Sequence, residues 1–175
     1  MGLIPTAAVL TVSDRSFRGE RPDGAGPLLK NLLQSRDWDV LHLRVVPDDV
    51  AGIQDVLRGW CGENIDLIVT TGGTGLGPRD VTPEATAPLL DKELPGLVEW
   101  MRGAGQRKNP FAILSRAVAG TRRQSLIINL PGNPSGALES LELLLPVLPH
   151  ACHTLRGGDH SLERPAHDRA DPVHP

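Results

Sequence analysis

The sequence predicts an α/β protein, specifically a three-layer αβα sandwich with a mostly parallel sheet. Short apolar runs rich in β-branched residues, each of strand length, recur along the chain. Segments with the spacing of amphipathic helices separate these runs. Strands that alternate with helices in this way are typical of a parallel sheet covered by helices on both faces. From the length of 175 residues we expect one domain over 1–157, followed by an extended tail over 158–175 that lacks periodicity.

Five stretches of the chain are expected to form the strands. They are Thr6–Val12, Val40–Val46, Ile65–Val69, Ala117–Gly120 and Ser125–Leu130. In the second stretch Leu41 and Leu43 alternate with His42 and Arg44, which predicts partial exposure at a sheet edge or a subunit contact. The fourth stretch is short and suits an edge strand, whereas the fifth is almost entirely apolar and suits the centre of the sheet.

Helical spacing of apolar residues predicts the two covering layers. The clearest buried face combines Ile53, Val56, Leu57 and Trp60 at i, i+3, i+4 and i+7. The other expected helices are one opened by Pro27, one over Pro83–Leu90, one carrying Leu97, Val98 and Met101 after a break at Leu94-Pro95-Gly96, and one over Leu138–Leu148. Pro146 and Pro149 should kink or interrupt the last helix.

Composition excludes several broad classes of protein. The formal net charge of -3 argues against nucleic-acid binding driven by bulk charge. No apolar run reaches the ~20 residues of a membrane span, and no secretory signal is recognisable, so we expect neither membrane nor nucleic acid as a partner. Cys61 and Cys152 lack metal-ligand spacing and read as free thiols in a reducing cytoplasm. The widely spaced histidines in and before the tail read as solvated rather than as a metal site.

The segment from Thr70 to Thr86 is the most distinctive part of the chain. It leaves an apolar strand, passes through four glycines together with Arg79 and Asp80, and enters a helix at Thr82-Pro83. Backbone N–H groups in such a glycine-rich turn can approach an anion closely. The segment is neither a Walker A loop nor a complete dinucleotide fingerprint. A plain tight connection remains an alternative, but Arg79 and Asp80 favour a phosphate site.

Three loops of the expected fold should converge at the carboxyl ends of the strands. They are Ser13-Asp14-Arg15, Gly72 to Asp80, and Pro131 to Gly136. Open α/β sheets bind ligands at this edge. From the residues alone, a turn cap is the favoured role for Ser13 and Asp14, and either Asp48 or Asp49 is the expected helix cap after the second strand. The residues therefore predict an anion or nucleotide site lined with carboxylates.

Several motifs, in a fixed order, carry a resemblance to a known family. They are Thr71-Gly72-Gly73-Thr74-Gly75, Pro78-Arg79-Asp80-Val81-Thr82-Pro83-Glu84-Ala85-Thr86, Leu114-Ser115-Arg116 and Asn129-Leu130-Pro131-Gly132-Asn133-Pro134. From about Pro5 to Leu155 the chain resembles molybdopterin adenylyltransferases of the Mog type and the G domains of plant and animal molybdenum-cofactor proteins.

The resemblance implies an enzyme of molybdenum cofactor biosynthesis with a three-layer α/β fold. In that family, a homotrimer converts molybdopterin and MgATP to adenylylated molybdopterin and pyrophosphate, and the product passes to a molybdate insertase. ATP and molybdopterin are thus the implied substrates and Mg²⁺ the implied cofactor. Carboxylate oxygens suit that ion. The alternatives are a molybdopterin-binding paralogue without the transferase activity, and a non-catalytic trimeric carrier or scaffold.

The same resemblance assigns roles to individual residues. It implies Asp48 and Asp80 as catalytic residues that act through Mg²⁺, with Asp48 preferred to Asp49 because it follows Pro47 directly. The implied nucleotide-binding residues are Ser13, Asp14, Gly72, Gly73, Thr74, Gly75, Pro131, Gly132 and Asn133. The implied molybdopterin-binding residues are Ser115, Arg116, Thr82 and Glu84, with Arg116 placed to pair with the pterin phosphate.

Overall fold

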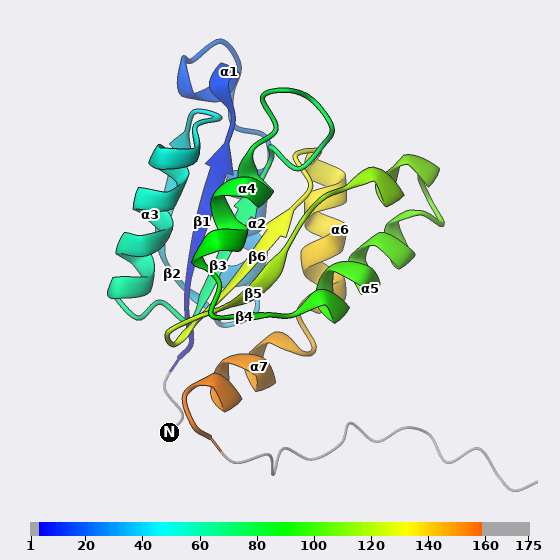
Figure 1. The fold of residues 1–175 in the computed structure, drawn as a ribbon. Helices are drawn as coiled ribbons and strands as arrows, with labels where there is room; N and C mark the ends of the chain where they lie inside the picture. The colour runs from blue at the N-terminus through cyan, green and yellow to red at the C-terminus, as the bar shows by residue number, and fades with distance from the viewer. Residues whose placement is uncertain (1–3, 159–175) are drawn as a thin grey trace, which may run out of the picture.

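A six-stranded sheet forms the middle layer of the molecule (Figure 1). The computed structural model describes residues 4–158, so the predicted tail lies outside the described residues except for Gly158. The strand order is β2-β1-β3-β6-β5-β4, in which the first four strands are parallel and β5 and β4 are antiparallel to their neighbours. The strands are β1 Thr6–Val12, β2 Asp39–Val46, β3 Leu67–Thr71, β4 Lys92–Glu93, β5 Ala119–Arg122 and β6 Ser125–Leu130.

Helices cover both faces of the sheet, which confirms the predicted three-layer class (Figure 1). The helices are α1 Asp14–Phe17, α2 Gly26–Gln34, α3 Val50–Gly62, α4 Thr82–Thr86, α5 Pro95–Gly105, α6 Pro134–Leu144 and α7 Leu148–Leu155, with short 3₁₀ turns η1 Ala87–Leu89 and η2 Pro110–Leu114. Residues of α3 and α4 pack on one face with alternate side chains of β1, including Ala8 and Leu10. Residues of α2, α5, α6 and α7 pack on the other face with Ala7 and Val9.

The predicted exposure pattern of the strands is largely confirmed. β2 is an edge strand, and its Leu41 and Leu43 side chains are 48% and 38% exposed. β6 lies between β3 and β5 and is buried along its whole length. The position of the other edge was predicted wrongly, because Lys92–Glu93 pairs outside β5 and forms the true edge. A strand of two residues is too short to show the alternation of apolar and polar residues by which strands are predicted from sequence.

The helix boundaries differ from expectation where proline is involved. Pro95 opens α5 rather than breaking the chain, because its missing N–H costs nothing in the first helical turn. The stretch after Pro83 forms α4 and then tightens into η1 instead of continuing as one helix. The predicted interruption near Pro146 is confirmed, since α6 ends at Leu144 and α7 begins at Leu148.

A buried carboxylate joins the start of the sheet to the end of the described chain. Asp66, which is 3% exposed, accepts hydrogen bonds from the backbone N–H and the hydroxyl of Thr6 at 2.8 and 2.9 Å. Its other oxygen lies 2.5 Å from Nε of Arg156, the residue that follows α7. This contact explains the single charged residue within the apolar run that leads into β3.

The described residues also bear on two expectations from composition. Within 4–158, none of the helices is long and apolar enough to cross a membrane. Cys61 and Cys152 are both buried and unpaired, and burial raises the pKa of the Cys152 thiol to about 12. Burial also raises the pKa of the Cys61 thiol, so the protonated form of both thiols is favoured at neutral pH.

Candidate functional site

The glycine-rich loop after β3 begins with two backbone conformations that side chains would obstruct. Gly72 has φ +99°, and a Cβ there would lie 2.3 Å from the carbonyl oxygen of Val12 in the neighbouring strand. Gly73 has φ +65°, and a Cβ there would lie 2.3 Å from the hydroxyl of Thr82. Both positions require glycine, for conformation and for space. The loop can therefore press its backbone against the end of β1 and the start of α4.

Hydrogen bonds hold this loop and the second strand-end loop together. Thr82 donates its hydroxyl to the carbonyl of Gly72 at 2.8 Å, and its backbone N–H donates to the carbonyl of Gly73 at 3.0 Å. Thr71 donates its hydroxyl to the carbonyl of Pro131 at 2.7 Å. A Cβ on Gly132 would lie 3.1 Å from Cα of Gly72, so the two loops are in direct backbone contact.

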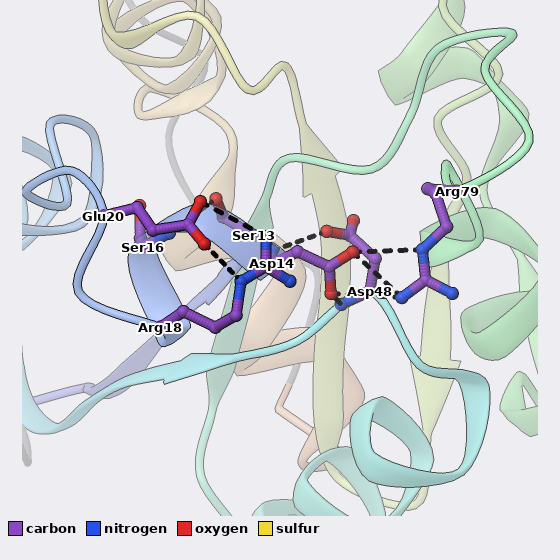
Figure 2. Close-up of polar contacts among 7 residues, drawn as sticks. All are labelled: Ser13, Asp14, Ser16, Arg18, Glu20, Asp48 and Arg79. Carbon is purple, nitrogen blue, oxygen red and sulfur yellow. Dashed lines mark hydrogen bonds and ion pairs between the residues drawn. The ribbon is translucent and has the colours of Figure 1, made fainter.

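Asp14 follows β1 and Asp48 follows β2, and the carboxylate of each accepts a hydrogen bond from the backbone N–H of the other (Figure 2). The backbone N–H of Asp14 donates to Oδ2 of Asp48 at 2.7 Å, and the N–H of Asp48 donates to Oδ1 of Asp14 at 3.0 Å. Arg79 reaches across from the glycine-rich loop and donates Nε and Nη2 to the two oxygens of Asp14 at 3.0 and 3.1 Å. Three segments that are distant in sequence therefore meet at one cluster.

The environments of these two carboxylates move their pKa values in opposite directions. The Asp48 N–H and then the Arg79 guanidinium hold the pKa of Asp14 below its usual value. Burial, followed by the negative charges of Asp14 and Asp80, raises the pKa of Asp48. Burial therefore makes the charged form of Asp48 less favourable than it would be in water, and a cation placed beside it would stabilise that form.

The two neighbouring aspartates after β2 have different surroundings. Asp49 is the N-cap of α3, where its Oδ2 accepts the N–H of Gly52 at 2.7 Å. Asp48 instead faces the strand-end loops, as its bond to Asp14 shows. Asp80 also faces inward, and its Oδ2 accepts the N–H of Gly77 at 2.8 Å within the glycine-rich loop. Asp48 and Asp80 line the same cavity.

Two cavities lie on either side of the glycine-rich loop. The smaller cavity has a volume of about 590 Å³ and is lined by Asp48 and Asp80, and also by Thr11, Ser13 and Gly72. The larger, of about 730 Å³, has Ser115 and Thr74 on one wall and an apolar lining that includes Val98, Met101, Phe111 and Leu114. The residues that line both cavities are Gly73, Asp80, Gly132 and Asn133.

The structure brings most of the predicted site residues to these cavities. Gly75 and Pro131 also line the larger cavity, and Asp14 adjoins the smaller cavity through its bonds to Asp48. Three residues that the resemblance assigns to the pterin lie elsewhere. Thr82 is fully buried beneath the loop, and Glu84 and Arg116 form an ion pair beside it without lining either cavity.

Sequence reasoning missed Asp23 as part of the smaller cavity. Its carboxylate accepts the hydroxyl of Thr11 at 2.7 Å and the backbone N–H groups of Ala25 and Gly26 at 3.2 and 2.9 Å. Pro22-Asp23-Gly24 had only the signature of a loop, which gave no reason to place it at the end of β1. The apolar wall of the larger cavity was missed for a similar reason, since α5, η2 and α6 each contribute only a few residues to it.

The donor set of the smaller cavity fits one kind of metal ion. Among residues 4–158, His, Cys, Asp and Glu side chains form no group of three or more that could hold a metal by themselves. Asp48 and Asp80 provide two carboxylates on one wall. Mg²⁺ is commonly held by one or two protein carboxylates together with substrate phosphates and waters. The residues present therefore fit a Mg²⁺ ion that binds together with a phosphorylated substrate.

The sheet is open and mostly parallel, and its strand ends carry a glycine-rich loop suited to anion binding together with several carboxylates. This combination defines a domain that binds phosphate compounds or nucleotides. The chain belongs to the family described as "Probable molybdopterin binding domain", whose sequence profile matches residues 8–150. A molybdopterin adenylyltransferase of Helicobacter pylori strain J99 is 42% identical over 152 residues, which cover 85% of this chain and 86% of the relative.

Solved structures and longer relatives support the same membership. The molybdopterin biosynthesis enzyme MoaB of Thermus thermophilus has a TM-score of 0.82 and 54% identity, with coverage of 87% of this chain and 96% of that one. The tungsten cofactor synthesizing protein MoaB of Pyrococcus furiosus has the same TM-score, 32% identity and coverage of 89% and 99%. The molybdenum cofactor biosynthesis bifunctional protein of Chlorobaculum tepidum is 38% identical over 90% of this chain. The chain spans half the length of that protein and less of two other curated relatives.

Proposed function

We propose that the protein is a nucleotidyltransferase of molybdenum cofactor biosynthesis that moves the adenylyl group of MgATP onto the phosphate of molybdopterin. The observation that carries this proposal is that the two cavities share a wall. Asp80 and Gly73 of the glycine-rich loop belong to this wall and line both cavities. A transfer between two bound phosphate compounds requires two such compartments that meet at one point. The names of relatives that match over most of their length favour the same reaction.

In this reaction an oxygen of the pterin phosphate attacks the α-phosphorus of ATP. The bond from that phosphorus to the oxygen bridging to the β-phosphate breaks, and pyrophosphate leaves with the electron pair. We assign ATP to the smaller cavity, where Ser13 and Gly72 lie beside the carboxylates, and the pterin to the larger cavity with Ser115 and its apolar wall. The wall formed by Gly73, Asp80, Gly132 and Asn133 is then where the reacting groups meet.

The chain's own contribution to this reaction is positioning and electrostatics. Backbone N–H groups of the glycine-rich loop and of Gly132 and Asn133 can orient phosphate oxygens. Asp48 and Asp80 would hold Mg²⁺, which when bound neutralises phosphate charge and favours an in-line geometry. The raised pKa of Asp48 suits this role, because a cation beside the carboxylate would offset the effect of its burial.

The first test is release of pyrophosphate from MgATP by the native protein, measured with and without molybdopterin. We expect release that requires molybdopterin, with one pyrophosphate released for each pterin adenylylated, and no release when EDTA removes the metal. Mass spectrometry of the pterin product should show the mass of an added AMP group. Tight binding of molybdopterin without any release would contradict the proposal and leave the carrier or scaffold function.

We also propose that the protein acts as a homotrimer, which delivers its product to a molybdate insertase in the cytoplasm. Exposed leucines support association: Leu28 on α2 and Leu41 and Leu43 on the edge strand β2 are each more than a third exposed.

Sedimentation equilibrium should give about three times the monomer mass of 18.8 kDa. Leu41→Glu should shift the mass towards the monomer, whereas Ile4→Glu, at another exposed apolar residue, should not. A monomeric native protein would contradict the trimer.

A further inference from the structure

We propose that Arg116 is a positioning residue that fixes the glycine-rich loop and thereby Asp80, in place of the direct contact with the pterin phosphate that the resemblance implies. The structural part of this inference stands on the contacts of Arg116 alone. Its consequence for turnover rests on the proposed function.

All three nitrogens of the Arg116 guanidinium already bond to other groups of the protein. Nε donates to the carbonyl of Gly75 at 2.7 Å, and Nη2 donates to the carbonyl of Asp80, also at 2.7 Å. Nη1 is paired with the carboxylate of Glu84, and the backbone N–H donates to the carbonyl of Thr74 at 2.9 Å. Each nitrogen of the guanidinium thus has a partner, so a phosphate could occupy the edge formed by Nε and Nη2 only by displacing the carbonyls of Gly75 and Asp80.

The outer part of the loop is held from one side by Arg79, which donates to Asp14, and from the other side by Arg116. Residues 76–79 are exposed, and Gly77 among them increases the entropy lost on ordering the segment. Within the segment, Gly77 and Asp80 close a small turn through the N–H of Gly77 on Oδ2 of Asp80 and the N–H of Asp80 on the carbonyl of Gly77. Arg116 holds the carbonyl of Asp80, at the end of this turn, and the carbonyl of Gly75, two residues before its start. It therefore fixes where the turn, and the carboxylate within it, points.

The anchors of Arg116 are themselves well held. Glu84 lies in the first turn of α4, and pairing with Arg116 lowers the pKa of its carboxyl, so the pair is charged at neutral pH. On the other side, Arg102 donates Nη1 to the carbonyls of Ser115 and Ala117 at 3.2 and 3.4 Å and holds the segment that carries Arg116. The neighbouring Ser115 lines the larger cavity. Arg116 consequently connects the wall of the larger cavity to the loop that bears Asp80.

The proposal is tested with Arg116→Ala and Arg116→Lys, each measured for amide hydrogen exchange of residues 75–80, molybdopterin affinity and turnover. In Arg116→Ala we expect the amides of residues 75–80 to exchange at least about tenfold faster. The loop then loses the two hydrogen bonds that the charged guanidinium donates to the carbonyls of Gly75 and Asp80. We expect kcat to fall about a hundredfold, as for a reacting group misplaced by roughly 1 Å, with the dissociation constant of molybdopterin changed less than about threefold. Arg116→Lys can hold only one carbonyl well and should lie between.

Arg122→Ala is the matched control, because Arg122 also donates to a backbone carbonyl, that of Leu89, at 2.8 Å, but away from the loop. It should leave loop exchange and turnover unchanged. Glu84→Gln keeps Arg116 in place and weakens one anchor, so a smaller rise in loop exchange is expected even if Arg116→Ala folds poorly. Unchanged loop exchange in Arg116→Ala, or a large loss of molybdopterin affinity with the loop still protected, would overturn the inference. Failure of the native protein to release pyrophosphate would instead overturn the proposed function.

Discussion

Asp80→Asn is expected to abolish pyrophosphate release while the protein still folds and still binds molybdopterin. Asparagine has nearly the same volume, and its side-chain oxygen can still accept the N–H of Gly77 that Asp80 accepts at 2.8 Å. Only the negative charge at the wall common to both cavities is lost. Removal of one group that stabilises charge in a transition state costs about 10²–10³ in kcat, and loss of a Mg²⁺ ligand should cost no less.

Asp49→Asn provides the matched control for this experiment. Asp49 lies directly beside Asp48 in sequence but serves as the N-cap of α3, and asparagine is about as good a cap as aspartate. Turnover of Asp49→Asn should therefore equal that of the native protein, whereas Asp48→Asn should fall with Asp80→Asn. Pyrophosphate release within about twofold of native in Asp80→Asn would refute a catalytic role for this carboxylate. Equal losses in Asp48→Asn and Asp49→Asn would show that the helix start, not a specific charge, is what the reaction needs.

The contrast between Asp48 and Asp49 shows what the sequence could and could not predict about the site. Local rules identified the strand end, the helix start and a carboxylate that caps it, because these depend on residues adjacent in the chain. Which aspartate faces the cavity depends on the bond between Asp48 and Asp14, two residues that are 34 positions apart. Only the resemblance to known motifs favoured Asp48 before the structure.

The fold was predicted better than the cavities for the same physical reason. The alternation of residues in β2 and the apolar run of β6 reflect how buried each residue is. The sequence therefore predicted that β2 lies at an edge of the sheet and β6 at its centre. The larger cavity combines a few residues from each of α5, η2 and α6, none of which has a pattern that distinguishes a cavity wall from ordinary core. The contacts of Arg116 are likewise tertiary, since its guanidinium meets carbonyls some 36 and 41 positions earlier.

Asp66→Ala is expected to cause a large loss of stability although the residue lies away from the site. Asp66 is nearly fully buried, and its two oxygens hold Thr6 at the start of β1 and Arg156 after α7. Alanine would leave the N–H of Thr6 without its acceptor and Arg156 without its counterion, next to the hydrophobic core. Breaking a buried pair from one side typically costs about 3–5 kcal/mol, and we expect about 3 kcal/mol here because the Arg156 side chain is 37% exposed and can be partly rehydrated.

Urea denaturation followed by circular dichroism measures this change, with Asp55→Ala as the control. Asp55 also pairs with an arginine, Arg58, at 3.7 Å, but its side chain is 79% exposed, so its removal should cost less than about 1 kcal/mol. Arg156→Ala should also destabilise the protein, because it leaves the buried Asp66 carboxylate without its counterion although both bonds from Thr6 remain. A loss for Asp66→Ala no larger than that for Asp55→Ala would mean that the two ends of the described chain are not held together through this carboxylate. In that case packing of α7 against the sheet, through buried residues such as Leu148 and Cys152, would have to account for its position.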